Sequence, residues 1–294
     1  MAHDEDRTVA HDAVPPALHD AVPPALEETP PVATVERWVW DFIHATSLSE
    51  KMSPSPPPSR WEIRPPPRRI ERPGRPESLL VNRHAPKTPS AGALQAPAKR
   101  AELIHRFLHH ELQAAELMGW ALLAFPTAPL AFRRGLLQIL GDEVRHMGHY
   151  QDYLGALGYH YGNFPVRDWF WERVPSSQSP AHFVAVLGIG FEGANLDHTH
   201  RFAERFRAAG DLEGAALQDQ IGEEEVPHVR FAMRWFREWT GGVDFTIWAA
   251  HLPPPLSPIL MRGRPIHRKE RRRSGFSDSF LDELEQWAFA APGS

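Results

Sequence analysis

The stretch Gly141-Asp142-Glu143-Val144-Arg145-His146 holds a glutamate and a histidine three residues apart, and the same spacing returns at Glu225 and His228. On an α-helix, residues three apart lie on one face, one turn from each other. A carboxylate and an imidazole stacked in this way can bind one metal ion from the same side. One such pair means little by itself, because Glu102 and His105 form a third with no matching partner. The residues around the two pairs decide whether they indicate a metal site.

A further glutamate precedes each pair at nearly the same distance. Glu111 lies 32 residues before Glu143, and Glu192 lies 33 residues before Glu225. The midpoint of each interval falls in a sequence suited to a helical turn, proline-rich in the first case and Ala-Ala-Gly-Asp in the second. Residues equidistant from the turn of an antiparallel helix pair lie at the same height. Each upstream glutamate should therefore face the Glu–His pair that follows it.

Two such hairpins packed face to face would bring four carboxylates and two imidazoles to one level of a four-helix bundle. This is the ligand set of a dinuclear iron or manganese carboxylate centre, in which two helices give one glutamate each and two give Glu-x-x-His. Four buried carboxylates would cost many kcal/mol if left unpaired, and two divalent cations would neutralise them. The predicted cofactor is therefore two Fe (or Mn) ions. The predicted metal ligands are Glu111, Glu143, His146, Glu192, Glu225 and His228.

Four helical patterns carry these residues, over about 99–124, 130–157, 181–208 and 212–239. In each pattern the candidate ligand occupies a position of the apolar stripe, where a hydrophobic residue would be expected. A connection of roughly twenty residues, 158–180, joins the second helix to the third, and such a long crossover is typical of the ferritin-like topology. We therefore expect an all-α, ferritin-like four-helix bundle made of two antiparallel helical hairpins joined by a long crossover.

The chain divides by composition into four regions: a disordered low-complexity repeat at 1–34, a Pro-rich and largely irregular arm with a short helix at 35–97, the four-helix bundle at 98–240, and a C-terminal extension with a short helix at 241–294. The first region repeats an octapeptide without change, as His11–Leu18 and His19–Leu26. Repeated sequence with Pro-Pro steps cannot sustain a helix or pack a core. The short helices are expected near Val35–Ile43 and after a cap at Ser277.

Composition limits the chemistry and the location. The 294 residues include no cysteine, which excludes disulfides, iron–sulfur clusters and thiolate metal sites. The net charge of −5 argues against general affinity for nucleic acid, although a tRNA substrate stays open. The N-terminus lacks the features of a secretion signal, and no apolar run is long enough to span a membrane. We expect a cytoplasmic protein, monomeric or homodimeric, without a membrane partner.

Each glutamate of the two pairs directly follows another acid, Asp142 or Glu224. A metal-bound imidazole usually donates its other N–H to a carboxylate, which fixes the tautomer of the ring. We therefore expect Asp142 to pair with His228 and Glu224 to pair with His146, across the bundle. The alternative is that both are surface acids.

Three features leave alternatives open. Pro227 removes a backbone donor inside the fourth helix and should kink it, which either opens or spoils the site. The stretch Asp168-Trp169-Phe170-Trp171 either covers one end of the bundle or walls a substrate pocket. Two basic runs, 60–75 and 268–273, are expected at the surface, with an RNA or partner contact as the alternative for the first.

The residues also carry a resemblance. The stretch 142–146 resembles the D-E-x-R-H box of di-iron oxygenases. Together with the stretches 110–114, 132–135 and 73–76, it makes roughly residues 70–285 similar to a bacterial ferritin-like family, domain of unknown function 455. The resemblance implies a ferritin-like bundle and carries the six predicted ligands over as the matching metal positions. The nearest understood analogues of that family are non-haem di-iron tRNA hydroxylases and related oxygenases.

A dinuclear centre whose open coordination positions face a pocket suits the activation of O2 for the hydroxylation of an organic substrate. The sequence therefore favours an O2-dependent oxidoreductase of the hydroxylase or oxygenase type, with an unknown substrate and an electron donor as partners. No catalytic residue beyond the metal ligands is predicted. Two alternatives stay open, namely an iron-handling protein (ferroxidase or storage) and a metal-stabilised bundle that serves as a binding module.

Overall fold

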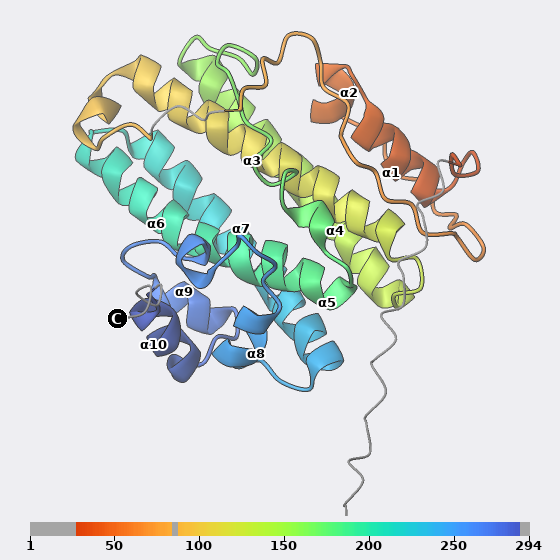
Figure 1. The fold of residues 1–294 in the computed structure, drawn as a ribbon. Coiled ribbons are helices and arrows are strands. Elements are labelled where there is room, and N and C mark those ends of the chain that lie inside the picture. Colours follow the sequence, from red (N-terminus) through yellow and green to blue (C-terminus); the bar gives the residue numbers. More distant parts are fainter. Residues whose placement is uncertain (1–27, 84–87, 289–294) are drawn as a thin grey trace, which may run out of the picture.

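The computed structural model describes residues 28–83 and 88–288, and within these ranges its regular structure is helical apart from one isolated bridge between Val81 and Val166. The predicted all-α class is therefore confirmed. Residues 1–27, which hold the octapeptide repeat, lie outside the described residues. Four long helical segments form a bundle with shorter helices packed on two sides (Figure 1). The long segments are α3 (Pro97–Ala124), α4 (Leu130–Ala156), the run of α5 (Pro180–Phe183), η3 (Val184–Glu192) and α6 (Gly193–Ala208), and α7 (Leu212–Thr240).

The bundle contains the two helix pairs that the turns predict, since α3 packs along α4 and α6 packs along α7. The second turn shows why its sequence suits the fold. Gly210 has a φ of +79°, a left-handed conformation that glycine adopts without steric cost. Asp211 then caps α7, because its side chain accepts a hydrogen bond from the backbone N–H of Gly214. These two residues end one helix and start the next within a single short turn.

The third long segment differs from the regular α-helix expected over 181–208. Residues Val184–Glu192 form a π-helix, a conformation that is rare in proteins and frequent at functional sites. The segment packs closely on α7, since a Cβ atom at Gly188 would lie only 2.3 Å from the Cβ of Ala232. Glu192, one of the predicted ligands, is the last residue of this π-helix.

Pro227 does not end the fourth helix, because α7 continues through it to Thr240. A proline leaves the carbonyl of the residue four positions earlier without its helical donor. That residue is Glu223, and both Glu223 and Pro227 lie on the exposed face of α7. Water can therefore satisfy the freed carbonyl, and the buried face of the helix is preserved.

Shorter helices cover the bundle on two sides (Figure 1). On one side, α1 packs against α3, as expected for the short helix of the arm. On the other, the C-terminal extension packs against η3, α6 and α7, and its last helix begins at the predicted cap, since Ser277 Oγ accepts from the N–H of Phe280. None of the helices in the described ranges has an apolar stretch long enough to cross a membrane. These shorter helices are α1 (Val35–His44), α2 (Leu48–Met52), η1 (Gly92–Gln95), η2 (Val174–Ser176), α8 (Phe245–Ala250), η4 (Pro258–Met261), α9 (Arg268–Arg273) and α10 (Asp278–Gln286).

The two basic runs are partly buried, contrary to the expectation that they lie at the surface. Arg75 of the arm donates to the buried carboxylate of Glu116 in α3 at 2.5 Å and to Asp168 in the crossover at 2.8 Å. Lys51 donates to the same Glu116 at 2.7 Å, and both of these side chains are fully buried. In the C-terminal run, Arg271 is fully buried and paired at 2.8 Å with the buried Asp197 of α6. Both runs thus attach their segments to the bundle.

Candidate metal centre

The six predicted ligands meet in the middle of the bundle, and none of them is more than 5% exposed. Their ligand atoms form two groups in which all atoms lie within 4.8 Å of one another. The two groups share Glu143 of α4. The first consists of Glu111, Glu143, His146 and Glu225, and the second of Glu143, Glu192 and His228. The structure therefore brings together residues from all four long helical segments, as the hairpin symmetry predicts.

Both imidazole rings direct Nδ1 toward the carboxylates. His146 Nδ1 lies 3.3 Å from Glu143 Oε2 and 3.8 Å from Glu111 Oε2. His228 Nδ1 lies 3.1 Å from Glu143 Oε1 and 3.3 Å from Glu225 Oε2. Glu143 thus lies between the two rings and contacts each of them through a different carboxylate oxygen.

The opposite ring nitrogens are held by the two outer acids. His146 Nε2 lies 3.1 Å from Glu224 Oε2, and His228 Nε2 lies 3.2 Å from Asp142 Oδ2. Both contacts predicted across the bundle are thus present. Arg145 joins the two acids, since it donates to Asp142 at 2.6 Å and to Glu224 at 2.7 Å. With Nε2 fixed in this way, Nδ1 of each ring is oriented toward the carboxylate cluster.

Several ligand atoms have no hydrogen-bond partner within the described part of the chain. These are Oε1 of Glu143 and both carboxylate oxygens of Glu192, all buried. His228 Nδ1 is near Glu143 Oε1, but their alignment is not that of a hydrogen bond. Buried carboxylate oxygens without partners are costly, and divalent cations would satisfy them. A donor set made only of carboxylate oxygen and imidazole nitrogen suits iron, manganese or zinc. The residues present therefore fit two divalent metal ions.

The protonation of the cluster supports the same conclusion. Burial and the neighbouring Glu143 raise the pKa of Glu111 well above its usual value, and burial and the neighbouring Glu225 do the same for the pKa of Glu192. Burial opposes a charge on His146, but its interactions with Glu111 and Glu143 outweigh this effect and raise its pKa to about 11. The site therefore holds protons at neutral pH, and a bound metal would displace them.

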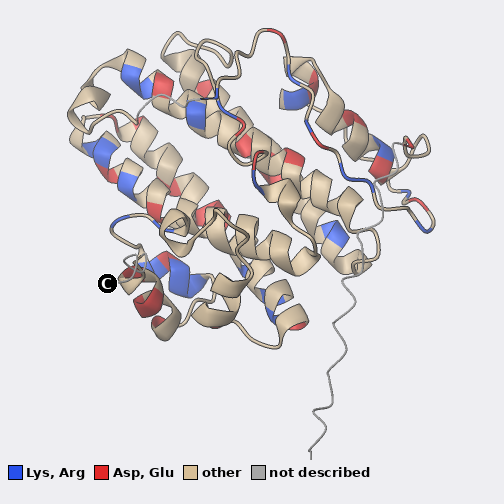
Figure 2. Ribbon diagram, viewed as in Figure 1, with Lys and Arg blue, Asp and Glu red and all other residues tan. Residues whose placement is uncertain are grey.

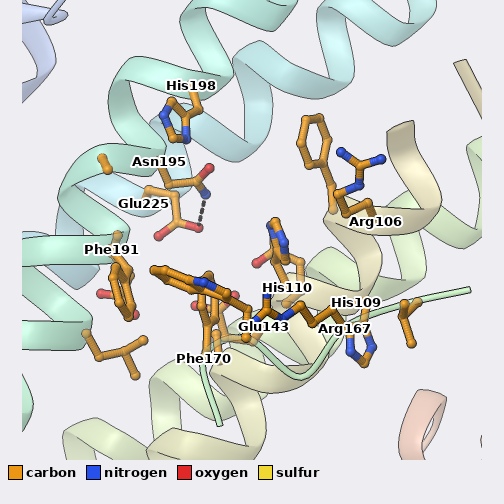
Figure 3. Close-up of a pocket in the computed structure, with 18 of the residues that line it drawn as sticks. Arg106, His109, His110, Glu143, Arg167, Phe170, Phe191, Asn195, His198 and Glu225 are labelled. Atoms are coloured by element: carbon orange, nitrogen blue, oxygen red, sulfur yellow. Dashed lines mark hydrogen bonds between the residues drawn. The ribbon is translucent and has the colours of Figure 1, made fainter. Parts of the chain in front are cut away.

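A cavity of about 350 Å³ opens between α3 and the η3–α6 segment, beneath the crossover residues 165–170. The four ligand carboxylates line this cavity, whereas neither ligand histidine does. Figure 3 shows Glu143 and Glu225 among the cavity residues. Trp169 and Phe170 also line it, so this aromatic stretch forms part of a pocket wall. The open side of the centre faces the cavity, and the imidazoles close the other side.

The cavity wall also includes His110, Asn195 and His198, which the sequence does not predict as metal ligands (Figure 3). Asn195 donates from Nδ2 to Glu225 Oε1 at 3.1 Å and so helps to orient that ligand. A signal for two of them exists in the sequence, because Glu192, Asn195 and His198 follow one another at three-residue intervals and so share a helical face. Which polar residues line the cavity could not be predicted without knowing where the crossover lies.

Comparison with known proteins identifies a family. Residues 33–282 match the family described as "Protein of unknown function (DUF455)". A protein of Haemophilus influenzae described as "Uncharacterized protein" is 26% identical over 166 residues, which cover 53% of this chain and 56% of that protein. No solved structure matches. Since the family match extends over most of the sequence, the chain belongs to the DUF455 family.

Proposed function

We propose that this chain is a ferritin-like, non-haem dinuclear metal carboxylate protein, di-iron or Fe/Mn, which acts as an O2-dependent oxidoreductase of the hydroxylase or oxygenase type. The observation that carries the proposal is the one-sided arrangement of the centre. Four carboxylates line a cavity, and two imidazoles held by outer acids close the opposite side. The pairing of α3 with α4 and of α6 with α7, joined by a long crossover, supports the ferritin-like assignment.

The contacts suggest which residues would hold each ion. Glu111 and His146 would hold one, and Glu192 and His228 the other. Glu143 and Glu225 would bridge the two, because Glu225 also approaches both rings, with Oε1 4.0 Å from His146 Nδ1 and Oε2 3.3 Å from His228 Nδ1. One glutamate and one histidine for each ion, with two shared glutamates, is the arrangement that two Glu-x-x-His helices favour.

Two bound ions of this kind would supply the redox chemistry toward O2. In a hydroxylation, a substrate C–H bond, O2, two electrons from an external donor and two protons give a C–OH bond and one water. The contributions of the protein are orientation and exclusion of water. Arg145 fixes both outer acids, Asn195 fixes Glu225, and the rings of Trp169 and Phe170 cover the cavity from solvent.

The cavity favours an organic substrate over iron handling alone. Its wall beyond the carboxylates is mostly aromatic and aliphatic, with an apolar lining that a ferrous ion does not need. Figure 2 shows lysine and arginine interspersed with aspartate and glutamate along the long helices, and the net charge of the chain is −5, which does not favour general affinity for tRNA. A small organic molecule is therefore the substrate that the site supports best.

Elemental analysis of the full chain after anaerobic loading with ferrous iron tests the proposal. We expect close to two metal ions per chain, and a sharp loss in both Glu143→Ala and Glu225→Ala. Glu223→Ala is the matched control, because this neighbouring glutamate is exposed on the other face of α7. One metal ion or none in the unmodified chain would refute the dinuclear site. Ferrous iron oxidised by O2 in bulk, with mineral held by a large assembly, would favour iron storage instead.

A further inference from the structure

Beyond the four glutamates, the cavity wall carries basic rather than acidic side chains. Apart from the four glutamates of the centre, the described residues that line the cavity include no acid. They include two arginines on the same side of the cavity, Arg106 from α3 and Arg167 from the crossover (Figure 3). Their side chains are 16% and 26% exposed, so they lie nearer to solvent than the glutamates do. Both arginines also contact acids that do not line the cavity, since Arg167 pairs with Glu172 at 2.6 Å and Arg106 Nη2 lies 3.8 Å from Glu102 Oε1. With the four glutamates neutralised by two divalent cations, these two guanidinium groups are the charged donors that the described cavity wall offers to a ligand.

Aromatic rings form another part of the cavity wall. The rings of Phe170 and Phe191 stack with centroids 4.9 Å apart and planes inclined by 12°. Trp169 packs against Phe191 with centroids 5.0 Å apart. Aromatic faces of this kind favour a flat apolar ligand. The volume of about 350 Å³ lies at the small end of the range for ligand pockets, roughly 300–1,000 Å³, so the occupant is a small molecule.

Two imidazoles of the wall offer polar contacts without a partner. His110 and His198 both line the cavity, and neither forms a hydrogen bond within the described structure. Burial and the nearby Arg201 lower the pKa of His198 to about 4, so this ring is neutral. A neutral imidazole can receive a hydroxyl or carbonyl group of a ligand but adds no charge. The anionic end of a ligand is therefore received by the arginines.

We infer that the cavity binds a small organic acid, with a flat apolar body lying along Phe170 and Phe191 toward the centre and a single anionic group near Arg106 and Arg167. This inference rests on the proposed function, because it names the substrate class of the same site. It places the carbon to be hydroxylated at the apolar end, next to the glutamates. A nucleotide within an RNA strand would also present a flat base and an anion, and the experiment below separates the two.

Isothermal titration calorimetry on the full metal-loaded chain tests the inference. The probes are benzoate, phenylacetate, 3-phenylpropanoate and indole-3-acetate, each compared with its primary amide. At least one acid should bind about tenfold or more tightly than its amide, since only the acid forms charge-assisted hydrogen bonds with the arginines. Equal binding of acid and amide, or binding of neither, overturns the inference. Tight binding of a single-stranded RNA oligonucleotide in place of the acids also overturns it.

Two variants test whether Arg167 recognises the charge of the ligand or only holds the crossover in place. Arg167 is paired with Glu172 at 2.6 Å on the crossover, so Arg167→Gln and Glu172→Gln both remove this ion pair. Only Arg167→Gln removes the cation from the cavity. It should lower the affinity for the acid about tenfold and leave that of the amide unchanged, whereas Glu172→Gln should keep or raise the affinity for the acid. An equal loss in both variants would show that the pair only holds the loop, which refutes the charge recognition.

Metal content measured on the same samples keeps the two proposals distinguishable. Two metal ions per chain with no acid bound would refute this inference and leave the dinuclear centre intact. Preferential binding of an acid by a chain that takes up no metal would refute the proposed function and leave the ligand class of the cavity supported.

Discussion

Replacing Glu224 by glutamine should weaken the metal ion held at His146 without unfolding the chain. The carboxylate of Glu224 lies 3.1 Å from His146 Nε2, and its charge makes the ring a better ligand. Loss of such an outer partner typically lowers metal affinity about 10–100-fold. The side chain of Glu224 is 29% exposed and also contacts the half-exposed Arg145. Solvent therefore screens part of the interaction, and we expect the lower end of that range, about tenfold or about 1.4 kcal/mol.

The near symmetry of the centre supplies an internal comparison. Asp142 holds His228 at 3.2 Å and is 26% exposed, so Asp142→Asn should weaken the other ion by a similar factor. Glu223→Gln is the matched control, because this acid adjoins Glu224 but pairs with Arg273 at the surface. The assay is competition for Mn²⁺ or anaerobic Fe²⁺ with a chromophoric chelator. Unchanged affinity in both variants, or an equal loss in the control, would refute this account of the outer acids.

Three further predictions concern stability and protons. Glu192→Leu should raise the free energy of unfolding of the metal-free chain by about 1–3 kcal/mol, since it removes two buried oxygens that have no partner within the described structure. Urea denaturation with a chelator present measures this change in stability. Asp197→Asn should lower the free energy of unfolding by about 3–5 kcal/mol, because it leaves the fully buried Arg271 without a counter-charge. As a control in the same assay, the exposed Asp219→Asn should change the free energy of unfolding by less than about 1 kcal/mol. Metal affinity should rise with pH, and binding should release protons, because His146 has a pKa of about 11 and must lose a proton to bind a metal ion. Metal titrations at several pH values and the proton release into weak buffer measure these two effects. A metal affinity that does not depend on pH would contradict the prediction.

The cluster of four glutamates and two histidines could be predicted from the sequence, because the spacings that define it are local and occur twice. Glu143 and His146 share a helical face by spacing alone, and the turn positions place Glu111 beside them. The outer acids followed from one chemical rule, applied to residues adjacent to the ligands. Neither step required knowledge of how distant segments pack, so both the helix pairs and the meeting of the six residues agree with the structure.

What could not be predicted depends on contacts between segments far apart in the chain. The pair of Asp197 and Arg271 joins residues 74 positions apart, and no spacing rule relates them. The π-helix that ends at Glu192 cannot be predicted, because its sequence is almost wholly apolar and carries no periodicity that distinguishes a π-helix from an α-helix. The cavity exists only because the crossover folds back over α3, where Gln113 accepts a hydrogen bond from the N–H of Phe170 at 2.9 Å.

The buried cluster around Glu116 has a consequence for how this chain can be shortened. Its carboxylate sits fully buried in α3, and its two counter-charges, Lys51 and Arg75, both come from the arm. A truncation that starts at residue 98 would keep the acid and remove both cations, leaving an uncompensated charge in the interior. The same truncation would remove the contact of Arg75 with Asp168, one of the contacts that hold the crossover over the cavity. The arm is therefore part of the unit that folds independently. Expression of the bundle alone would yield a destabilised protein in which the crossover is less firmly held over the cavity.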